Sequence, residues 1–369
     1  MNPRLEKLYA AMERTRLDAV ALNPGATLTY LTDVTFHLME RPVVMFFVPG
    51  QEPALVLPTL ETPKLLDLPY LAAAFPYQED PSDWDSAFQQ AVQRLGLDAA
   101  HKRIGVEPRS LRLLEFRYLQ GAAPSADFPD ASAALGSLRL CKDPSEVQKM
   151  RRAVEIAEAA LQSILPLIRI GISERELAAE LMVELLRHGS APELPFAPIV
   201  SSGPNSANPH ASPSDRVLQP GDLLVVDWGA TFDGYISDLT RTFAIGTVNA
   251  ELAKIHAIVE QANAAGRAAA RPGASAADVD RAARSVIEQA GYGDYFTHRT
   301  GHGIGIEAHE PPYMRSDNHQ ILLPGMTFTI EPGIYLPGRG GVRIEDNILI
   351  TEDGAVSLSV LERGMIRIA

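Results

Sequence analysis

Two acidic residues stand where the sequence predicts the ends of two buried strands. In the stretch LQPGDLLVVDWGATFDGYISDLTRTF, the apolar run 223–226 is typical of a buried strand, and it ends on Asp227. A turn at Asp233 and Gly234 then reverses the chain, and a second strand carries Asp238 back beside the first. The two carboxylates therefore face each other across a predicted hairpin, in surroundings that do not suit a lone carboxylate.

The same arrangement recurs later in the chain, in the stretch LPGMTFTIEPGIYLPGRGGVRIED. Pro220 precedes Asp227 by seven positions, and Pro324 precedes Glu331 by the same seven positions. A glycine-rich turn follows in the second stretch, and the strand predicted after it holds Glu345, the counterpart of the second acid in the first stretch. Each stretch therefore offers a pair of carboxylates.

The two stretches are also preceded by matching helix starts. The patterns Gly171-x-Ser173-x-x-Glu176 and Gly273-x-Ser275-x-x-Asp278 each place a capping residue ahead of an acid at the third helical position. An apolar-periodic helix follows in both cases and ends near a glycine. We therefore expect this region to consist of two related halves.

Four carboxylates brought together by such a repeat would repel one another, and each would cost several kcal/mol to bury without a compensating charge. Two divalent cations supply the balancing charge, so the pattern predicts a dinuclear metal centre. A neutral ligand is expected in addition, and His302 lies between two glycines, which let the backbone approach a site closely. Taken singly, each acid also fits a solvated turn residue, and His302 a core histidine bonded to backbone.

Five stretches of the chain resemble, in order, the motifs of the proline-specific "pita-bread" metallopeptidases, the prolidase and aminopeptidase P group. They are NPHASPSDR, VVDWGATFDGYISDLTRTF, THRTGHGIGIEAHEPP, TIEPGIY and GVRIED, and the resemblance covers about residues 145 to 369. It implies that Asp227 chelates one metal ion, that His302 and Glu331 bind the other, and that Asp238 and Glu345 bridge both. It also implies Mn²⁺ as the usual activator, although an oxygen-rich set with one imidazole also accepts Co²⁺ or Zn²⁺.

The resemblance assigns the catalytic steps to three residues. Such a centre hydrolyses a carbonyl compound, and it needs a group that handles the proton and donors for the oxyanion. By resemblance, Glu331 handles the proton, while His210 and His309 contact the substrate carbonyl and stabilise the intermediate. Thr240, which comes two positions after Asp238, is interpreted as a residue that orients the ligands.

Three further residues are expected to bind the substrate. By resemblance His298 contacts it, although a structural hydrogen bond is the alternative, and Arg343 lies near the bound proline, although it also fits an ion pair with an acid of the site. Arg41, at the end of a loop in MERPVV, is expected to reach the free carboxylate of a dipeptide; its alternative is a solvated ion pair with Glu40. Core packing or an apolar proline pocket would account for Phe196, Ile199 and Tyr313.

Composition limits the class of protein and its partners. A chain of 369 residues with 46% hydrophobic and 21% charged residues is typical of a soluble protein with two domains. The formal net charge of −13 argues against nucleic acid or an anionic membrane as a partner. Cys141 is the single cysteine, and the sequence shows neither a signal peptide nor an uncharged apolar run of about 18 residues, so we expect a cytoplasmic protein.

The predicted fold class is α/β (α+β) with two domains. Residues 1–138 alternate helices with strands and resemble, more weakly, a creatinase-like N-terminal domain, with Asp33 where relatives often have glycine. Residues 139–369 are expected to form the pita-bread catalytic domain, in which helices lie outside a curved, mostly antiparallel sheet with a pseudo-twofold repeat. Asp143 and Pro144 mark a strong helix start. The helices expected in this domain span 144–165, 173–188, 250–270 and 275–291.

The function predicted from these residues is metal-dependent hydrolysis of the Xaa-Pro bond in small peptides that carry proline at the second position, most simply Xaa-Pro dipeptides. Aminopeptidase P activity on longer Xaa-Pro-Xaa peptides is the first alternative. A metal-free creatinase-type amidinohydrolase and a non-enzymatic binding protein on the same scaffold are further alternatives, but the chain keeps all five candidate ligands. The resemblance also implies a homodimer.

Overall fold

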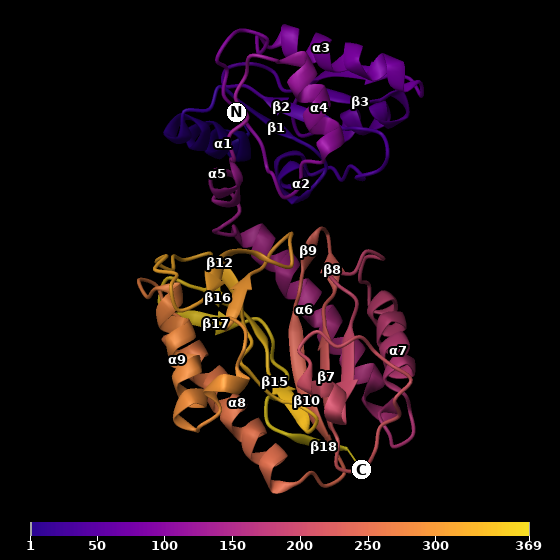
Figure 1. The fold of residues 1–369 in the computed structure, drawn as a ribbon, viewed down its shortest axis with the longest axis vertical. Helices are drawn as coiled ribbons and strands as arrows, with labels where there is room; N and C mark the ends of the chain where they lie inside the picture. Colours follow the sequence, from indigo (N-terminus) through magenta and orange to yellow (C-terminus); the bar gives the residue numbers. More distant parts are fainter. Residues whose placement is uncertain (1, 369) are drawn as a thin grey trace. The chain divides into compact units, whose positions relative to one another are not determined.

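The protein is divided into two compact units in a computed structural model that describes residues 2–368 (Figure 1). Unit 1 is Met1–Arg139 and unit 2 is Leu140–Ala369. The division lies one residue beyond the boundary at 138/139 that the sequence predicts.

Unit 1 is built on a five-stranded mixed sheet in the order β4-β3-β2-β1-β5. The pairs β3–β4 and β1–β5 are parallel, and the other two pairs are antiparallel. The strands are β1 (Ala19–Leu22), β2 (Val44–Phe47), β3 (Ala54–Pro58), β4 (Ala73–Tyr77) and β5 (Ile104–Gly105), and the helices are α1 (Pro3–Thr15), α2 (Ala26–Thr32), α3 (Trp84–Arg94), α4 (Leu113–Ala122) and α5 (Ser132–Gly136).

The alternation of helices and strands that the sequence predicts for unit 1 is present, but the sequence does not predict α2, β4, α5 or the 3₁₀ helix η1 (Thr59–Asp67). Helix α2 lies in TLTYLTD, a stretch whose β-branched residues do not favour a helix, and it ends on Asp33 in the left-handed conformation with φ of 55°. Arg4 of α1 holds this end, because its guanidinium donates to the Tyr30 carbonyl and to the Asp33 carboxylate at 2.6 Å each. A left-handed residue explains why glycine suits the position of Asp33.

Unit 2 contains a four-stranded sheet in the order β18-β10-β7-β6 and a five-stranded sheet in the order β12-β11-β13-β16-β17. Two hairpins, β8–β9 and β14–β15, complete it. Its strands are β6 (Ile199–Ser202), β7 (Leu223–Trp228), β8 (Thr231–Phe232), β9 (Tyr235–Ile236), β10 (Leu239–Ile245), β11 (Gly301–Gly303), β12 (Glu310–Met314), β13 (Thr327–Ile330), β14 (Gly333–Leu336), β15 (Gly340–Arg343), β16 (Asp346–Ile350), β17 (Ala355–Ser357) and β18 (Ile366–Ile368).

Four long helices accompany these sheets, and all four are predicted by the sequence. Asp143 caps the first of them in a capping box with Glu146. In Figure 1, α8 and α9 flank the strands of the second half, and α7 lies beside those of the first half. The helices are α6 (Pro144–Ile164), α7 (Glu174–Arg187), α8 (Ala250–Ala269) and α9 (Ala276–Gln289). Over the described range, none of the helices of the chain has the length and apolarity needed to cross a membrane.

The two-half prediction for unit 2 is confirmed by matching contacts. Antiparallel β7 and β10 enclose the β8–β9 hairpin, and antiparallel β13 and β16 enclose the β14–β15 hairpin. Ser173 and Ser275 each form a capping box. The amide of Gly171 donates to the Leu218 carbonyl and that of Gly273 to the Leu322 carbonyl, both at 3.0 Å. Equivalent sequence patterns therefore produce equivalent local structure.

Each half of unit 2 has an apolar cluster beneath its helices, and a further cluster joins residues of both halves. In the first half, residues of α6 and α7 such as Leu161 and Leu181 pack with Val226 and Phe243 of the sheet. In the second half, α9 packs against β13 and β16 through residues such as Val279. The halves meet where Thr240 and Glu345 form an isolated β-bridge, with the Glu345 amide 3.1 Å from the Thr240 carbonyl. The strand ends that carry the candidate acids are thereby held together.

Candidate metal centre

The four candidate acids lie at the ends of the paired strands. Asp227 is the second-last residue of β7, and Asp238 directly precedes β10. Glu331 directly follows β13, and Glu345 directly precedes β16. Because β7 and β10 are antiparallel, as are β13 and β16, the end of one strand lies beside the start of its partner, which brings the two acids of each half together. This is the arrangement that the sequence predicts.

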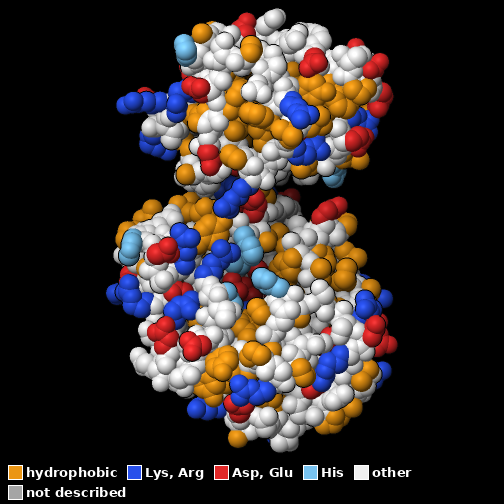
Figure 2. All heavy atoms as spheres, viewed as in Figure 1, with side chains coloured by type: hydrophobic (Ala, Val, Ile, Leu, Met, Phe, Trp, Pro, Cys, Tyr) orange, Lys and Arg blue, Asp and Glu red, His pale blue; other side chains and the backbone are white. Residues whose placement is uncertain are grey.

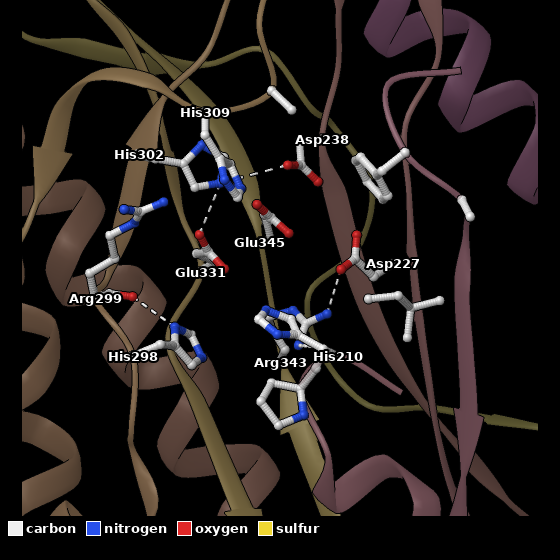
Figure 3. A pocket seen from close by; sticks show the side chains of 15 residues that line it. His210, Asp227, Asp238, His298, Arg299, His302, His309, Glu331, Arg343 and Glu345 are labelled. Carbon is white, nitrogen blue, oxygen red and sulfur yellow. Dashed lines mark hydrogen bonds and ion pairs between the residues drawn. The ribbon is translucent and has the colours of Figure 1, made fainter. Parts of the chain in front are cut away.

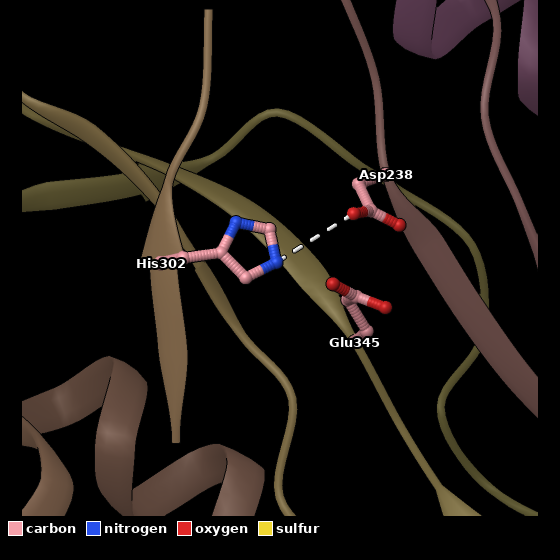
Figure 4. A group of neighbouring side chains, drawn as sticks. All are labelled: Asp238, His302 and Glu345. Atoms are coloured by element: carbon pink, nitrogen blue, oxygen red, sulfur yellow. Dashed lines mark ion pairs between the residues drawn. The ribbon is translucent and has the colours of Figure 1, made fainter. Parts of the chain in front are cut away.

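The acids and His302 converge on one point. One ligand atom each from Asp238, His302 and Glu345 lie within 4.8 Å of one another, and Figure 4 shows these three side chains turned toward a common centre. His302 Nε2 is 3.7 Å from Asp238 Oδ2 and 3.2 Å from Glu331 Oε1. His302 Nδ1 lies 3.2 Å from the Gly303 carbonyl, to which it donates, so Nε2 is the ring nitrogen that faces the centre.

All five candidate ligands line a single cavity of about 530 Å³ in unit 2 (Figure 3). On the face shown in Figure 2, histidine side chains gather at a hollow in unit 2 with acidic side chains inside it. Four other predicted site residues line the same cavity, and Arg41 does not. The cavity is lined by Phe196, Ala197, Ile199, Pro209, His210, Asp227, Asp238, His298, Arg299, His302, Ala308, His309, Glu331, Arg343 and Glu345.

Burial makes the site unfavourable for ionised carboxylates. Burial, reinforced by the charges of the other acids, raises the pKa of Asp238 and of Glu345 well above their usual range. Burial also raises the pKa of Asp227, against the opposing charge of Arg343. Burial acts in the same direction on Glu331, but the hydrogen bond and charge of His302 outweigh it and lower its pKa to about 2. The chain therefore concentrates more negative charge here than its own cations balance.

Two carboxylate oxygens of the site are left without a partner. Within residues 2–368, Asp227 Oδ1 and Glu345 Oε1 are buried and accept no hydrogen bond. Such atoms cost free energy unless something else satisfies them. Oxygen donors from four carboxylates, one imidazole nitrogen and unsatisfied buried oxygens fit divalent cations, which prefer such ligands. The residues present therefore suit the metal that the sequence predicts.

The carboxylates are held in place by neighbouring polar groups. The Thr240 hydroxyl donates to Glu345 Oε2 at 2.7 Å and accepts from Arg343 Nε at 3.1 Å. Asn347 brackets Asp238, because its Nδ2 donates to the Asp238 carbonyl at 2.6 Å and its Oδ1 accepts from the Asp238 amide at 3.0 Å. The first set of contacts fixes the direction of the Glu345 carboxylate, and the second fixes the backbone that carries Asp238.

The glycines around His302 serve the packing of strands. A Cβ atom on Gly301 would lie 1.8 Å from the Thr329 carbonyl oxygen, and one on Gly303 would lie 2.1 Å from that of Pro311. The sequence predicts that these glycines let the backbone approach the metal site. The structure instead shows that they let β11 pack closely against β13 and against the chain at β12.

Arg343 takes the alternative that the sequence analysis left open, an ion pair with an acid of the site. Its buried guanidinium donates to Asp227 Oδ2 and, through NH1, to the Tyr335 hydroxyl at 2.9 Å. Burial lowers the pKa of Arg343, but the charges of nearby acids, Asp227, Glu345 and Glu331, outweigh it and raise that pKa. The arginine therefore stays charged and fixes Asp227, and contact with a bound proline remains a prediction.

The three cavity histidines that are not predicted ligands differ in their surroundings. His298 Nδ1 donates to the Arg299 carbonyl at 2.7 Å, and its Nε2 lies 2.9 Å from the Tyr335 hydroxyl, so the structural alternative accounts for both nitrogens. The ring of His309 is centred 4.0 Å from that of His302, and burial lowers the pKa of His309 to about 4. His210 is exposed at the cavity, which leaves its ring free for a substrate.

Arg41 lies in unit 1 and is paired there. Its guanidinium is 3.1 Å from Glu40 Oε1 and 2.5 Å from Glu79 Oε1. The ion pair with Glu40 is the alternative considered from the sequence. Contact between Arg41 and a substrate carboxylate stays a prediction.

Sequence reasoning missed Arg299 and Tyr335 although both lie inside recognised motifs. Arg299 lines the cavity and stacks on the Tyr313 ring at 4.5 Å. Tyr335 joins Arg343 to His298 by hydrogen bonds. Their positions inside these motifs could have indicated a role in the site, but neither side chain is of a type that the predicted metal ligands include. Of the proposed apolar wall, Phe196 and Ile199 line the cavity, whereas Tyr313 is absent from its lining.

The fold of unit 2 and its carboxylate–imidazole cluster define a metal-dependent enzyme. The chain belongs to metallopeptidase family M24, whose model matches residues 148–352, and the model of the creatinase/prolidase N-terminal domain matches residues 4–141. An Xaa-Pro dipeptidase of Lactobacillus helveticus is 34% identical over 351 residues, which are 95% of each chain.

Solved structures agree with this membership across the whole chain. A dipeptidase from Pyrococcus horikoshii OT3 is 37% identical with a TM-score of 0.93, covering 99% of this chain and 100% of the other. A prolidase from Thermococcus sibiricus is 31% identical with a TM-score of 0.94, covering 99% and 98%. The predicted family, the fold class and the assignment to metallopeptidases are therefore confirmed.

Proposed function

We propose that the protein hydrolyses Xaa-Pro dipeptides with the help of two divalent metal ions. The observation that carries the proposal is the convergence of four buried acids and one imidazole in one cavity. Relatives named Xaa-Pro dipeptidase and prolidase, similar along nearly their whole length, support the same substrate class.

The five ligands are proposed to divide the two ions among them. Asp227 would hold one ion, His302 and Glu331 would hold the other, and Asp238 and Glu345 would contribute to both. When bound, such ions polarise a carbonyl group and lower the pKa of water near neutrality. The free Oδ1 of Asp227 and free Oε1 of Glu345 are consistent with these roles. Mn²⁺ is the proposed metal, with Co²⁺ or Zn²⁺ as alternatives.

The remaining chemistry is assigned to side chains of the cavity. Glu331, which lines the cavity and lies 3.2 Å from His302 Nε2, is proposed to take a proton and return it to the leaving amine. His309 is neutral at that pH because burial lowers its pKa to about 4, so it offers one N–H to the substrate carbonyl oxygen. His210 is proposed to act on the same oxygen from an exposed position.

Substrate binding is proposed to use the walls of the same cavity. Its volume of about 530 Å³ is in the range of small-molecule sites. Phe196 and Ile199 provide an apolar wall for a proline ring, and His298 and Arg343 border the cavity near it. Arg41 is proposed to bind the dipeptide carboxylate, which requires the loss of its pairing with Glu40 or Glu79.

The proposal includes a cytoplasmic homodimer. A single cysteine, Cys141, supports a reducing compartment, and the resemblance to the family supports the dimer. Light scattering of the purified protein at several concentrations tests the dimer, and fractionation of the source cells tests the location.

Metal removal and substrate comparison test the function together. The protein is stripped with a chelator, Mn²⁺, Co²⁺ or Zn²⁺ is added back separately, and hydrolysis of an Xaa-Pro dipeptide is compared with that of an Xaa-Pro-Xaa tripeptide. We expect no turnover without metal, recovery with Mn²⁺, and a higher kcat/KM for the dipeptide. Arg41→Ala should reduce the preference for the dipeptide.

Each alternative predicts a different result. Faster turnover of the tripeptide indicates aminopeptidase P activity. Turnover of creatine by the stripped protein indicates an amidinohydrolase, and metal binding without any peptide hydrolysis indicates a binding protein. An unchanged dipeptide preference in Arg41→Ala would refute the role of Arg41.

A further inference from the structure

The buried carboxylate of Glu174 binds both ends of the segment 202–214, which carries His210. Glu174 is the first residue of α7 and is fully buried. Its Oε1 accepts from the Ser202 amide at 2.7 Å and from the Ser202 hydroxyl at 2.8 Å. Its Oε2 accepts from the Ser214 amide at 3.1 Å and from the Ser214 hydroxyl at 2.6 Å. Residues 202 and 214 are thereby fixed to the same side chain.

The interior of the segment is attached to the same carboxylate. Asn205, in the short helix η4 (Gly203–Ala207), donates through Nδ2 to both oxygens of Glu174 at 3.1 Å. Ser206 of η4 accepts from the Gly341 amide at 2.8 Å, which ties the segment to β15 in the second half. The segment 202–214 is therefore ordered by a defined set of contacts, with Glu174 at its centre.

Glu174 is stabilised by these hydrogen bonds and by its place at a helix start. Among the salt bridges of residues 2–368, none involves Glu174. A carboxylate in the first turn of a helix is favoured by the backbone N–H groups that point toward it. Hydrogen bonds to an ionised acceptor are stronger than those between neutral groups, so the carboxylate holds the segment better than an amide would.

The His210 side chain has no other means of fixing its position. Its ring forms no hydrogen bond within the described residues, and the residue is exposed at the cavity. Only backbone groups near it are held: its amide donates to Asn208 Oδ1 at 3.0 Å, and the Pro209 carbonyl accepts from Arg343 NH1 at 3.3 Å. The direction of the ring therefore depends on the path of the segment.

The second half anchors its histidine segment in a comparable way. Asp280 of α9 is fully buried and accepts from the Thr300 amide at 3.1 Å and from its hydroxyl at 2.7 Å. Arg284, paired with Asp280, donates to the His298 carbonyl at 2.7 Å. In each half, a buried acid near the start of the outer helix holds a segment that brings a histidine to the cavity.

We infer that Glu174 is a positioning residue that sets the catalytic placement of His210 through the segment 202–214. The inference rests on the proposed function, in which His210 acts on the substrate carbonyl. Glu174 touches neither the cavity nor the candidate ligands, so its effect on turnover passes through the histidine.

Glu174→Gln tests this role with little change in shape. The amide nitrogen that replaces one oxygen faces a backbone N–H, so the contact with the backbone amide of Ser202 or of Ser214 is lost. We expect kcat to fall on the order of 10²-fold through misplacement of His210, with metal content unchanged. Glu176→Gln is the matched control: Glu176 lies two residues along α7 and bonds only Ser173, so kcat should stay near the wild-type value.

A double-mutant comparison separates positioning from general damage. If Glu174 acts through His210, Glu174→Gln should lower kcat no further in a protein that already carries His210→Ala. An equal loss in both backgrounds, or an unchanged kcat in Glu174→Gln alone, would overturn the inference. If Glu174→Gln fails to fold, Ser214→Ala is the second test, because it removes one anchoring hydroxyl and leaves every residue of α7 unchanged. It should lower kcat by a smaller factor, and this loss should likewise be absent in a protein that already carries His210→Ala.

Amide hydrogen exchange provides a readout that needs no turnover. Glu174→Gln should lower protection across 203–214, and Glu176→Gln should not. Unchanged protection across this segment would overturn the inference. Lower protection in a protein whose wild type fails to hydrolyse Xaa-Pro peptides would support the anchoring and refute the proposed function.

Discussion

Glu345 illustrates how this chain prepares a carboxylate for a ligand that it does not supply. One oxygen of Glu345 accepts from the Thr240 hydroxyl at 2.7 Å, and the other is buried without a partner. Burial and the charges of Glu331 and Asp227 raise its pKa. A cation on the free oxygen of Glu345 would stabilise its ionised form, because it would offset the repulsion from the other acids and give the unpartnered oxygen a contact.

The contact with Thr240 makes a prediction about metal affinity. Thr240→Val keeps the shape of the side chain and removes the hydrogen bond to Glu345. We expect metal affinity, measured by calorimetric titration of the stripped protein, to fall by about 10–100-fold. Thr327→Val is the matched control, because Thr327 is as deeply buried and donates to the Ile304 carbonyl at 2.6 Å, away from the acids. Equal losses in the two variants would contradict the prediction.

His256 predicts a pH dependence of stability that does not involve the metal. This residue of α8 is buried, and burial lowers its pKa from 6.5 to about 4, although a hydrogen bond with the Thr242 backbone opposes the shift. The unfolded chain binds a proton below pH 6.5 that the folded chain takes up only near pH 4. The contribution of His256 to the free energy of unfolding is therefore complete above pH 6.5. It is lost as the pH falls from 6.5 to 4, by about 3 kcal/mol in total.

Replacing His256 tests this sign. In His256→Leu, the free energy of unfolding should fall less steeply between pH 6.5 and pH 4 than in the wild type. The difference in slope corresponds to at most one fewer proton taken up on unfolding. Urea titrations at several pH values measure the slope. His101→Leu is the control, because it removes a histidine at an exposed position outside the core. A slope unaffected by His256→Leu would contradict the account.

At this scale the sequence predicts the identity of the acids better than the pairs they form. Strand ends and repeat spacing are local properties of the sequence, so Asp227 and Glu345 can be predicted as site residues from the sequence alone. The contact between Arg343 and Asp227 joins residues 116 positions apart, and no rule of sequence spacing predicts which acid the arginine contacts. Glu174 is a similar case, because its partners become visible only when the segment 202–214 folds over the start of α7.

At the scale of elements, the close approach of β11 to its neighbours makes the glycines indispensable. Gly303→Ala places a Cβ 2.1 Å from the Pro311 carbonyl oxygen, where backbone has to move. We expect a loss of stability of about 3 kcal/mol or more and weaker metal binding, since His302 moves with the strand. Gly354→Ala is the control, because its Cβ meets no atom within 4 Å, and its effect should stay within about 0.5 kcal/mol.

Elements were predicted where local rules agree with the fold. The capping boxes at Ser173 and Ser275 formed as their patterns require. Helix α2 was missed because its β-branched residues argue against a helix, while Arg4 from another element holds its end. Strand β4 was missed because Pro76 lies within it; as an edge strand of unit 1, β4 tolerates the missing N–H.

At the scale of the whole molecule, every predicted metal ligand belongs to unit 2. Unit 1 has its own sheet and its own core, which includes Phe46 and Phe88. Arg41 is the one predicted site residue that unit 1 contributes. Metal binding is therefore expected to stabilise unit 2 directly. The two tryptophans make the consequence measurable, because Trp84 lies in unit 1 and Trp228 in unit 2.

Fluorescence of single-tryptophan variants can follow each unit as the protein is heated. Trp84→Phe leaves Trp228 as the reporter of unit 2, and Trp228→Phe leaves Trp84 as the reporter of unit 1. Each variant is compared with itself, stripped and metal-loaded, so the cost of either substitution cancels. At a free metal concentration 100 times Kd, binding adds about 2.7 kcal/mol, which should raise the Tm reported by Trp228 by roughly 5–10 °C.

The Tm reported by Trp84 should move less than that reported by Trp228, because no candidate ligand lies in unit 1. Asp238→Asn should abolish the shift at Trp228, since it removes one of the two acids proposed to bridge the ions. A shift at Trp84 alone would place the metal outside the cluster and contradict the proposed centre. Equal shifts at both reporters that Asp238→Asn abolishes would instead mean that the two units unfold together and share the stabilisation from one centre.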